Sequence, residues 1–430
     1  MNLSSLPVGW RVARLGFLVE THVPQRDKPD PLNGPIPWVR IEDFDGQEIR
    51  VSKSGQGVTA EQVADMNLRV LSPGTVLCSC SCSMGATAIV REPLVSNQTF
   101  IGLTPGPEVE SRFLLYLMHA MRDRLQALAT GAIQQYLSRD DFRALRVPLP
   151  SLAEQRRIAD FLDSETARID KLRELRAQQL ALLTEAAVCR VYNAVRGGSV
   201  AGARKDSGLN WLGSVPESWR VAAVSHFFDV ELGKMLNEER STGDHLRPYL
   251  RVANVQWDHI DIGELAMMNF PPNEQSRYRL REGDLLVNEG GSWPGRAAIW
   301  THGATEMYYQ KALHRIRPRT GELPRWLYYC LVVAERVRVF QVQGNTSTMT
   351  HLTREQLRPQ RFPFPDKATQ AALVAELDAA AERDKGLQGL LRRQLALFAE
   401  RRQALITAAV TGQFDVSTAS GRNVTEGITA

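Results

Sequence analysis

The chain has 430 residues, of which 43% are hydrophobic and 23% are charged. This composition excludes a collagen-like, low-complexity or strongly charged disordered protein, and the length predicts several folded domains. The formal net charge of +4 is compatible with a nucleic-acid partner but does not indicate one, because such binding depends on basic residues that converge on one face.

The sequence carries no sign of a membrane or secretory protein. It contains no uncharged apolar run of about eighteen residues, and its N-terminus lacks a basic start followed by an apolar segment. Its five cysteines are too few for a disulfide framework. We therefore expect a cytoplasmic location and reduced thiols.

Two copies of one long pattern follow each other in the chain. Trp10 and Arg11 follow a proline-containing turn, and Trp219 and Arg220 do so 209 residues later. The segment PWVRIEDFDG recurs as PYLRVANVQW, and SRFLLYLM recurs as PRWLYYCL, in the same order. This period is far longer than that of a solenoid repeat, so the sequence predicts a duplication of whole domains.

Each copy begins with short runs rich in β-branched and aromatic residues, separated by Pro, Gly, Asn and Asp. Such runs predict strands and turns. A stretch with apolar residues at helical spacing follows in each copy. We therefore expect two similar mixed α/β (α+β) domains, at residues 1–150 and 214–365.

A long helix is predicted after each domain, at residues 151–198 and 366–412. Ser151 and Glu154 fit a capping box at the start of the first helix. Apolar residues form a narrow stripe on each helix, which predicts an antiparallel coiled coil. The stripe positions that we assign to the coiled coil or to contact with a partner are Ile158, Leu162, Ile169, Leu172, Leu175, Leu373, Leu377, Leu387, Leu391 and Phe398.

The coiled coil has an alternative, in which each helix packs only on its own domain or on a partner subunit. Residues 199–213 are rich in small and polar residues and predict a linker, and residues 413–430 predict a disordered polar tail.

No catalytic motif is evident in the chain. The glycine-rich loops of an S-adenosylmethionine or ATP site are missing, as are the HExxH and GxSxG motifs, and NFPPN at residues 269–273 is interpreted as a loop. Asp284 and Glu289 lack the following lysine of a metal-dependent nuclease. The chain is therefore predicted to be non-catalytic.

Cys78, Cys80 and Cys82 would share one face of a strand, which raises the possibility of a metal site. The second copy has Val287, Glu289 and Gly291 at the equivalent positions. We therefore favour small buried residues and predict no metal site.

The order of these parts resembles the DNA specificity (S) subunits of type I restriction-modification enzymes. The most specific segments are DSGLNWLGSVPESWRV (206–221), VPLPSLAEQRRIADFLD (147–163) and ITAAVTGQFDV (406–416). The resemblance implies two target-recognition domains, each of which reads one half of a split, asymmetric DNA sequence, and two spacer helices that set the gap. It also implies two methyltransferase (modification) subunits that carry S-adenosylmethionine, and motor-nuclease (restriction) subunits that consume ATP with Mg; this chain itself would hold no cofactor.

Side chains that read base edges are expected on loops that recur in both copies. These loops are residues 82–88 with 291–297, and residues 131–141 with 344–355. The candidate DNA-binding residues are Ser83, Gln134, Gln135, Arg139, Arg296, Lys311, Thr348 and Arg354. Each of them could instead be a solvated loop residue or a helix cap.

A second hypothesis is a non-catalytic coiled-coil adapter whose globular halves bind protein or RNA. Duplex DNA binding with a steep dependence on salt would favour the first hypothesis, and protein binding that is insensitive to salt would favour the second.

Overall fold

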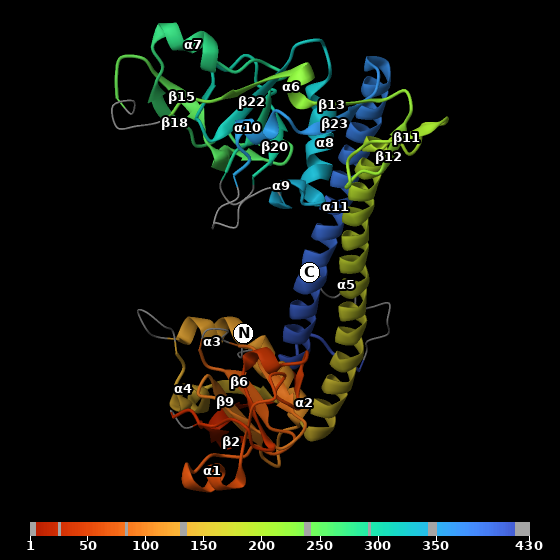
Figure 1. Ribbon diagram of the computed structural model, residues 1–430. Coiled ribbons are helices and arrows are strands. Elements are labelled where there is room, and N and C mark those ends of the chain that lie inside the picture. The colour runs from red at the N-terminus through yellow and green to blue at the C-terminus, as the bar shows by residue number, and fades with distance from the viewer. Residues whose placement is uncertain are drawn as a thin grey trace. The chain divides into compact units, whose positions relative to one another are not determined.

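The structure is a computed structural model that describes residues 6–24, 27–81, 85–129, 136–235, 242–290, 294–342 and 351–417. Two compact units divide the chain: unit 1 holds Met1–Ala177 and Arg392–Ala430, and unit 2 holds Gln178–Leu391. Both boundaries fall within the long helices α5 (Leu152–Val195) and α11 (Lys367–Val410), shown in olive and blue in Figure 1. Each unit therefore contains a segment of both helices.

Unit 1 is built around a five-stranded sheet with the strand order β2-β9-β6-β7-β4 and a three-stranded sheet with the order β5-β3-β8. The strands are β1 (Arg11–Arg14), β2 (Val19–His22), β3 (Ile36–Val39), β4 (Glu48–Ile49), β5 (Gly57–Val58), β6 (Val76–Ser79), β7 (Thr87–Val90), β8 (Val95–Ser96), β9 (Phe100–Pro105) and β10 (Arg146–Leu149). The helices before α5 are η1 (Leu15–Phe17), η2 (Ile41–Asp43), α1 (Ala60–Asp65), α2 (Ser111–Ala120), α3 (Arg122–Leu128) and α4 (Arg139–Ala144).

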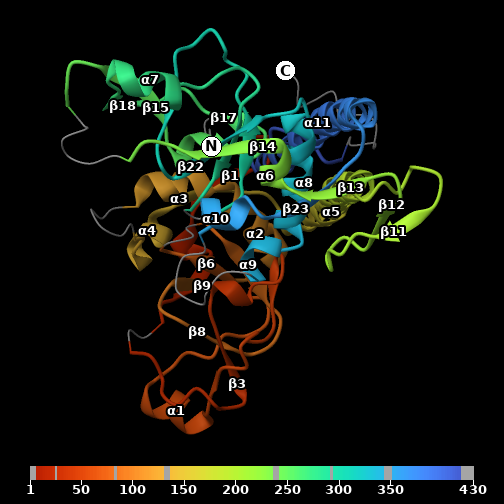
Figure 2. The same cartoon turned by 45° about the horizontal axis from the view of Figure 1, so that its top comes forward.

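Helix α2 forms the centre of the unit 1 core, because its residues Phe113–Met118 are all buried. Leu125 of α3 and Phe142 of α4 join the same cluster. The three-stranded sheet lies beside α1 at one end of the unit, away from α3 and α4 (Figure 2). Helices α3 and α4 are thus packed on the main core of unit 1.

Unit 2 repeats this plan with a four-stranded sheet in the order β14-β22-β19-β20 and a three-stranded sheet in the order β18-β15-β21. Its strands are β11 (Arg204–Asp206), β12 (Ser214–Pro216), β13 (Arg220–Ala223), β14 (Phe228–Leu232), β15 (Leu246–Leu250), β16 (Val255–Gln256), β17 (His259–Ile260), β18 (Ala266–Asn269), β19 (Leu285–Asn288), β20 (Ala297–Ile299), β21 (Tyr308–Tyr309), β22 (Leu313–Pro318) and β23 (Arg361–Phe364). Its helices before α11 are α6 (Val224–Phe227), η4 (Val252–Asn254), α7 (Pro272–Tyr278), α8 (Pro324–Arg336), α9 (Val339–Val342) and α10 (Arg354–Leu357).

The strand that opens each copy pairs with the strand that closes it. In unit 1, β1 and β10 are antiparallel, with Arg11 opposite Leu149. In unit 2, β13 and β23 are antiparallel in the same register, with Arg220 opposite Phe364. The predicted mixed α/β fold in two similar copies is therefore confirmed.

Both long helices have side-chain caps at their first turn. Ser151 Oγ accepts a hydrogen bond from the Glu154 amide (3.3 Å), and an Asp366 carboxylate oxygen accepts from the amides of Ala368 and Thr369 (both 3.0 Å). These polar caps satisfy amides that have no partner within the helix. Within the described residues, no helix is both long and apolar enough to span a lipid bilayer.

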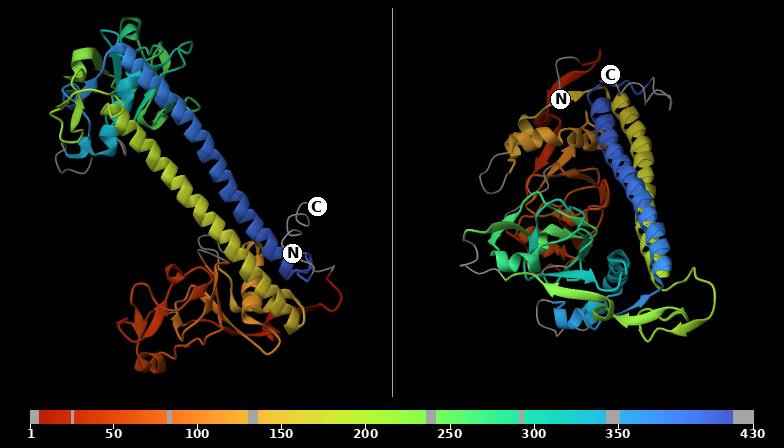
Figure 3. Two further views of the ribbon diagram at one scale, coloured as in Figure 1. Left: turned by 90° about the vertical axis from the view of Figure 1, so that its right-hand side faces the viewer. Right: turned by 90° about the horizontal axis from the view of Figure 1, so that it is seen from above.

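The predicted antiparallel pairing of the two long helices is confirmed, and it is defined most clearly at their two ends. In unit 1, Ile158, Leu162 and Ile169 of α5 share one core with residues 405–410 of α11. In unit 2, Val195 at the end of α5 shares a core with Leu373 and Leu377 near the start of α11. Within each unit, therefore, the end of one helix packs beside the start of the other (Figure 3), and the two run antiparallel.

The middle of the predicted stripe differs from the expectation. Leu391 is buried and Phe398 packs on the unit 1 core, but Leu172, Leu175 and Leu387 are 38%, 48% and 50% exposed. Two helices alone bury only a narrow seam, whereas the ends of α5 and α11 are also covered by a globular domain. The exposed leucines leave an apolar surface on the helices.

Three shorter segments also differ from the sequence predictions. The predicted linker contains β11, which pairs with β12, and Leu212 in it is buried. In the predicted disordered tail (413–430), the ring of Phe414 lies 5.6 Å from that of Phe161; residues 418–430 lie outside the described residues. In NFPPN, interpreted as a loop, Asn269 ends β18 and Asn273 lies in α7.

Candidate nucleic-acid interface

The two loops predicted to carry recognition residues lie together in unit 1. The Leu137 amide donates a hydrogen bond to the Cys80 carbonyl at 3.0 Å, and Leu137 is fully buried. Gly85 has a φ of +84°, and a Cβ there would lie 2.5 Å from Cγ of Arg122 at the start of α3. Cys80 and Gly85, which flank the tip of the loop after β6, therefore lie against the segment before α4 and the start of α3, respectively.

Unit 2 makes the same contact at the equivalent positions. The Leu352 amide donates to the Glu289 carbonyl at 2.7 Å, and a Cβ at Gly290 would meet the His351 ring at 2.6 Å. Leu352 also lies near Gly295 of the first loop, and its carbonyl is 2.7 Å from Nε2 of buried His314. The same backbone contact beside the candidate loops thus occurs in both copies, and it was not predicted from the sequence.

In the first copy, Arg139 is the candidate residue that the structure describes. It is exposed at the start of α4, which Ser138 and Asp141 cap reciprocally. Burial lowers the pKa of His22, and the nearby positive charges of Arg69 and Arg139 lower it further. Ser83, Gln134 and Gln135 lie outside the described residues.

The second copy holds two of its candidates by local contacts. Arg296 donates to the Gln256 side chain, and Arg354 Nε donates to the Val230 carbonyl at 2.8 Å. Lys311 is exposed, and its amide donates to the Lys234 carbonyl at 2.9 Å. Thr348 lies outside the described residues.

A repeated set of three arginines was missed by reading the loops residue by residue. Arg139, Arg143 and Arg146 in unit 1 correspond to Arg354, Arg358 and Arg361 in unit 2, each 215 residues later. We call each set an arginine triplet. Each triplet begins at the start of a short helix with a capping box (α4 or α10) and ends at the first residue of the strand that closes the copy (β10 or β23).

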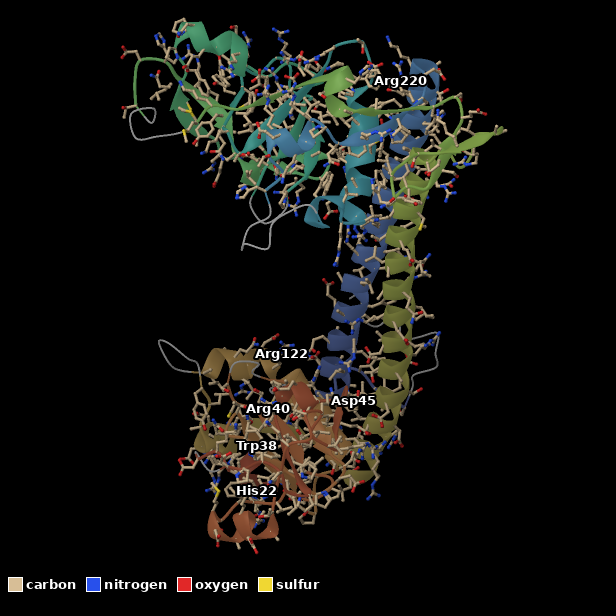
Figure 4. All side chains as sticks on the ribbon, in the orientation of Figure 1. His22, Trp38, Arg40, Asp45, Arg122 and Arg220 are labelled. Atoms are coloured by element: carbon tan, nitrogen blue, oxygen red, sulfur yellow. The ribbon has the colours of Figure 1, made fainter. Side chains whose placement is uncertain are left out.

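The triplets present positive charge at the surface. All six residues are exposed or half-buried, and among the described residues none of the six forms an ion pair. Arg122 at the start of neighbouring α3 adds a further exposed guanidinium (Figure 4). Asp140 and Asp141 lie on α4 as well, but Asp141 accepts hydrogen bonds from Ser138 as a cap. The repeated spacing of the arginines was the signal that the sequence offered.

Other polar clusters in the structure have structural roles. Cys78 and Cys80 are buried, as expected, and burial raises the pKa of Cys80 to about 11. Asp284 is buried and binds Arg317 through both carboxylate oxygens (2.7 and 2.6 Å). In the described part of the chain, no group of three or more His, Cys, Asp or Glu residues converges as a metal site.

Comparison with protein families finds similarity in the N-terminal part of the chain. Residues 7–181 match the family model described as the type I restriction modification DNA specificity domain. The type I restriction enzyme MjaIX specificity subunit of Methanocaldococcus jannaschii is 27% identical over 193 residues, which cover 44% of each protein. The EcoKI specificity subunit of Escherichia coli is 22% identical over 327 residues, which cover 72% of this chain and 67% of that subunit.

Solved structures share the fold over nearly the whole chain. A chain from a study of complex assembly and conformational transition of the type I R-M system superposes with a TM-score of 0.73 at 21% identity, covering 95% of this chain and all of that one. The HsdS subunit from Thermoanaerobacter tengcongensis superposes with a TM-score of 0.55 at 21% identity, covering 95% of this chain and 98% of the subunit. The resemblance to type I specificity subunits is therefore confirmed.

Proposed function

We propose, from this relationship to type I specificity subunits, that the chain selects the DNA sequence on which a restriction-modification complex acts. Each globular domain would read one half of a bipartite, asymmetric target. The repeated contact between the paired loops, with an arginine triplet beside it in each copy, is the observation that supports this function most directly.

The two parts of each surface suit different tasks. Arginine guanidinium groups that form no ion pair are available to phosphate oxygens, and phosphate contacts position a protein on the duplex without reading sequence. Loops at the ends of β6 and β19 can carry side chains into a groove, where base edges distinguish the pairs. The triplets would therefore orient each domain, and the loops would specify the bases.

The long helices would hold the two domains at a set spacing and bind the methyltransferase subunits. Leu175 in unit 1 and Leu387 in unit 2 are about half exposed on helices whose other faces are charged. Leu182, Leu390 and Leu397 are 65%, 58% and 54% exposed. Such leucines on a long helix fit a partner surface that would bury them.

Chemistry would come from the partners. The methyltransferase subunits would carry S-adenosylmethionine, the restriction subunits would use ATP and Mg, and this chain would be the non-catalytic member of the complex in the cytoplasm. The adapter hypothesis receives less support, because the relatives are DNA specificity subunits.

Methylation mapping tests this proposal. The chain is co-expressed with the methyltransferase encoded beside it, and modified adenines in host DNA are mapped by long-read sequencing. We expect one split motif with a fixed gap, which is absent when this chain is omitted. A soluble complex with an active methyltransferase that places no such motif would contradict the proposal and favour the adapter.

A further inference from the structure

Each globular domain is attached to a long helix by the same two polar contacts. The first uses a buried glutamine in the first turn of the helix. In unit 1, Gln155 accepts from the Glu110 amide (2.9 Å) and donates to the carbonyls of Glu108 (2.9 Å) and Pro150 (3.0 Å). In unit 2, Gln370 accepts from the Leu323 amide (3.1 Å) and donates to the Pro365 carbonyl (2.9 Å).

The second contact joins an arginine and a tyrosine of the domain to an aspartate of the long helix. In unit 1, Asp163 of α5 accepts from Arg112 Nη1 (2.8 Å) and from the Tyr116 hydroxyl (2.7 Å). In unit 2, Asp378 of α11 accepts from Arg325 Nε (2.8 Å) and from the Tyr329 hydroxyl (2.5 Å). We call each Arg-Tyr-Asp group a clamp.

The two clamps contain the same three residue types, but the residues around them differ. Arg112 has Glu110 and Asp160 as further ion-pair partners, at 3.1 and 2.7 Å. Leu323 and Ala375 stand at the corresponding positions of the second copy, and Arg325 instead binds Asp258 from the turn between β16 and β17. The same three residues thus occur in both copies with different supporting carboxylates.

Stability alone is a weak reason for the clamps. The carboxylates of Asp163 and Asp378 are 42% and 41% exposed, and ion pairs at such exposure contribute little because water screens them. Their geometry is nevertheless well defined, since Tyr116 is fully buried and Tyr329 is 4% exposed. A buried ring that aims its hydroxyl at a helix aspartate fixes the rotation of the domain about that helix.

Two attachment points on one rigid helix also fix its direction relative to the domain. The glutamine and the aspartate are eight positions apart in both copies, which is about 12 Å along a helix. On B-DNA, a gap longer by one base pair moves a half-site by about 3.4 Å and turns it by roughly 35°. A domain free to rotate on its helix would therefore accept neighbouring gaps.

We propose that the Arg112-Tyr116-Asp163 and Arg325-Tyr329-Asp378 clamps are positioning groups that restrict the bound DNA to one gap length. The inference rests on the proposed function and adds a determinant of the gap outside the base-reading loops. Loss of one clamp lets one domain rotate slightly on its helix, so both clamps are needed for a single gap.

The test is the distribution of gap lengths methylated in the cell by the complex. Asp163→Asn and Asp378→Asn keep the shape of the side chain but remove its charge. We expect methylation of sites with gaps one base pair longer or shorter to rise about tenfold relative to the wild type, since charge-assisted hydrogen bonds are lost. Both half-site sequences should stay unchanged.

Two further variants separate positioning from folding. Tyr116→Phe and Tyr329→Phe remove only the hydroxyl and keep the buried ring, so they test the clamp even where an aspartate variant does not fold. Asp160→Asn is the matched control, because Asp160 binds Arg112 but not Tyr116, and it should keep the single wild-type gap.

The outcomes distinguish a failure of the positioning role from a failure of the proposed function. A single unchanged gap in the tyrosine variants and in the folded aspartate variants, even with less total methylation, would overturn the positioning role. A wild-type complex that methylates no split motif would instead refute the proposed function itself.

Discussion

Asp284 and Arg317 form an ion pair between neighbouring strands of unit 2, and the first copy has an uncharged pair at the corresponding positions. Asp284 is 2% exposed, and it also accepts a hydrogen bond from the Arg281 amide at 2.7 Å. At the corresponding positions of unit 1, Thr75 and Thr104 lie with their hydroxyl oxygens 3.0 Å apart. One fold therefore accommodates either a charged or a neutral polar pair there.

This comparison predicts a double-mutant cycle. Asp284→Thr alone leaves Arg317 without its partner, so we expect the free energy of unfolding to fall by about 3–5 kcal/mol. Asp284→Thr with Arg317→Thr should regain most of that loss, because the pair then resembles the one in unit 1. Chemical denaturation of the purified chain measures both values.

A surface pair provides the control for this cycle. Asp229 binds Arg319 with side chains 53% and 44% exposed, so Asp229→Thr should cost less than about 1 kcal/mol. A double variant no more stable than Asp284→Thr alone would show that the two copies do not tolerate the same pair.

At the scale of elements, α11 continues unbroken through Gly386 and Gly389, although glycine destabilises the interior of a helix. A Cβ at either glycine would meet no atom within 4 Å, and neither has a positive φ. We expect Gly386→Ala and Gly389→Ala each to stabilise the helix by about 0.5–1 kcal/mol, because alanine loses less backbone entropy on folding. Thermal unfolding followed by circular dichroism measures this change.

The matched control is Gly412→Ala, just after the helix. Gly412 has a φ of +72°, and a Cβ there would lie 2.5 Å from the Pro7 ring, so this variant should be destabilised. A loss of stability in Gly386→Ala would contradict this prediction and would mean that the helix pair requires a glycine at this position.

The bounds and the pairing of the long helices were predictable, but the burial of each residue on the apolar stripe was not. Prolines and polar caps limited the long helices to 151–198 and 366–412, and the structure has Leu152–Val195 and Lys367–Val410. Helical spacing shows which residues share a face, yet it does not show whether that face meets the same chain. For this reason, helical spacing alone could not show that Leu172, Leu175 and Leu387 are exposed in this chain.

For the molecule as a whole, the duplication carried more information than single residues did. The candidate loops were found because both copies contain them, whereas Arg143, Arg146, Arg358 and Arg361 were missed because each arginine was considered alone. The hairpin of β11 and β12 was also missed, since its small and polar residues resemble those of a linker. A short hairpin of this kind has no alternation of apolar and polar residues by which the sequence could reveal it.

The division of the chain into two compact units, each with its own arginine triplet, predicts that DNA affinity divides between two surfaces. Arg143→Ala with Arg146→Ala removes two positive charges from unit 1, and Arg358→Ala with Arg361→Ala does so in unit 2. If each arginine contacts one phosphate, each double variant should reduce the slope of log K against log salt by about 2, and the quadruple variant by about 4. Fluorescence anisotropy of the assembled complex on its target duplex, at several salt concentrations, measures these slopes.

The additivity is the decisive part of this prediction, because residues with separate cores and no shared partner contribute independently. Arg50→Ala with Arg69→Ala is the matched control: both arginines are exposed but already bind Glu48 and Glu20, at 2.8 and 3.1 Å, so the slope should not change. Slopes that match the wild type in both triplet variants would remove the triplets from the interface and leave DNA contact to the loops. A slope that falls in only one variant would mean that one domain alone is positioned through its triplet.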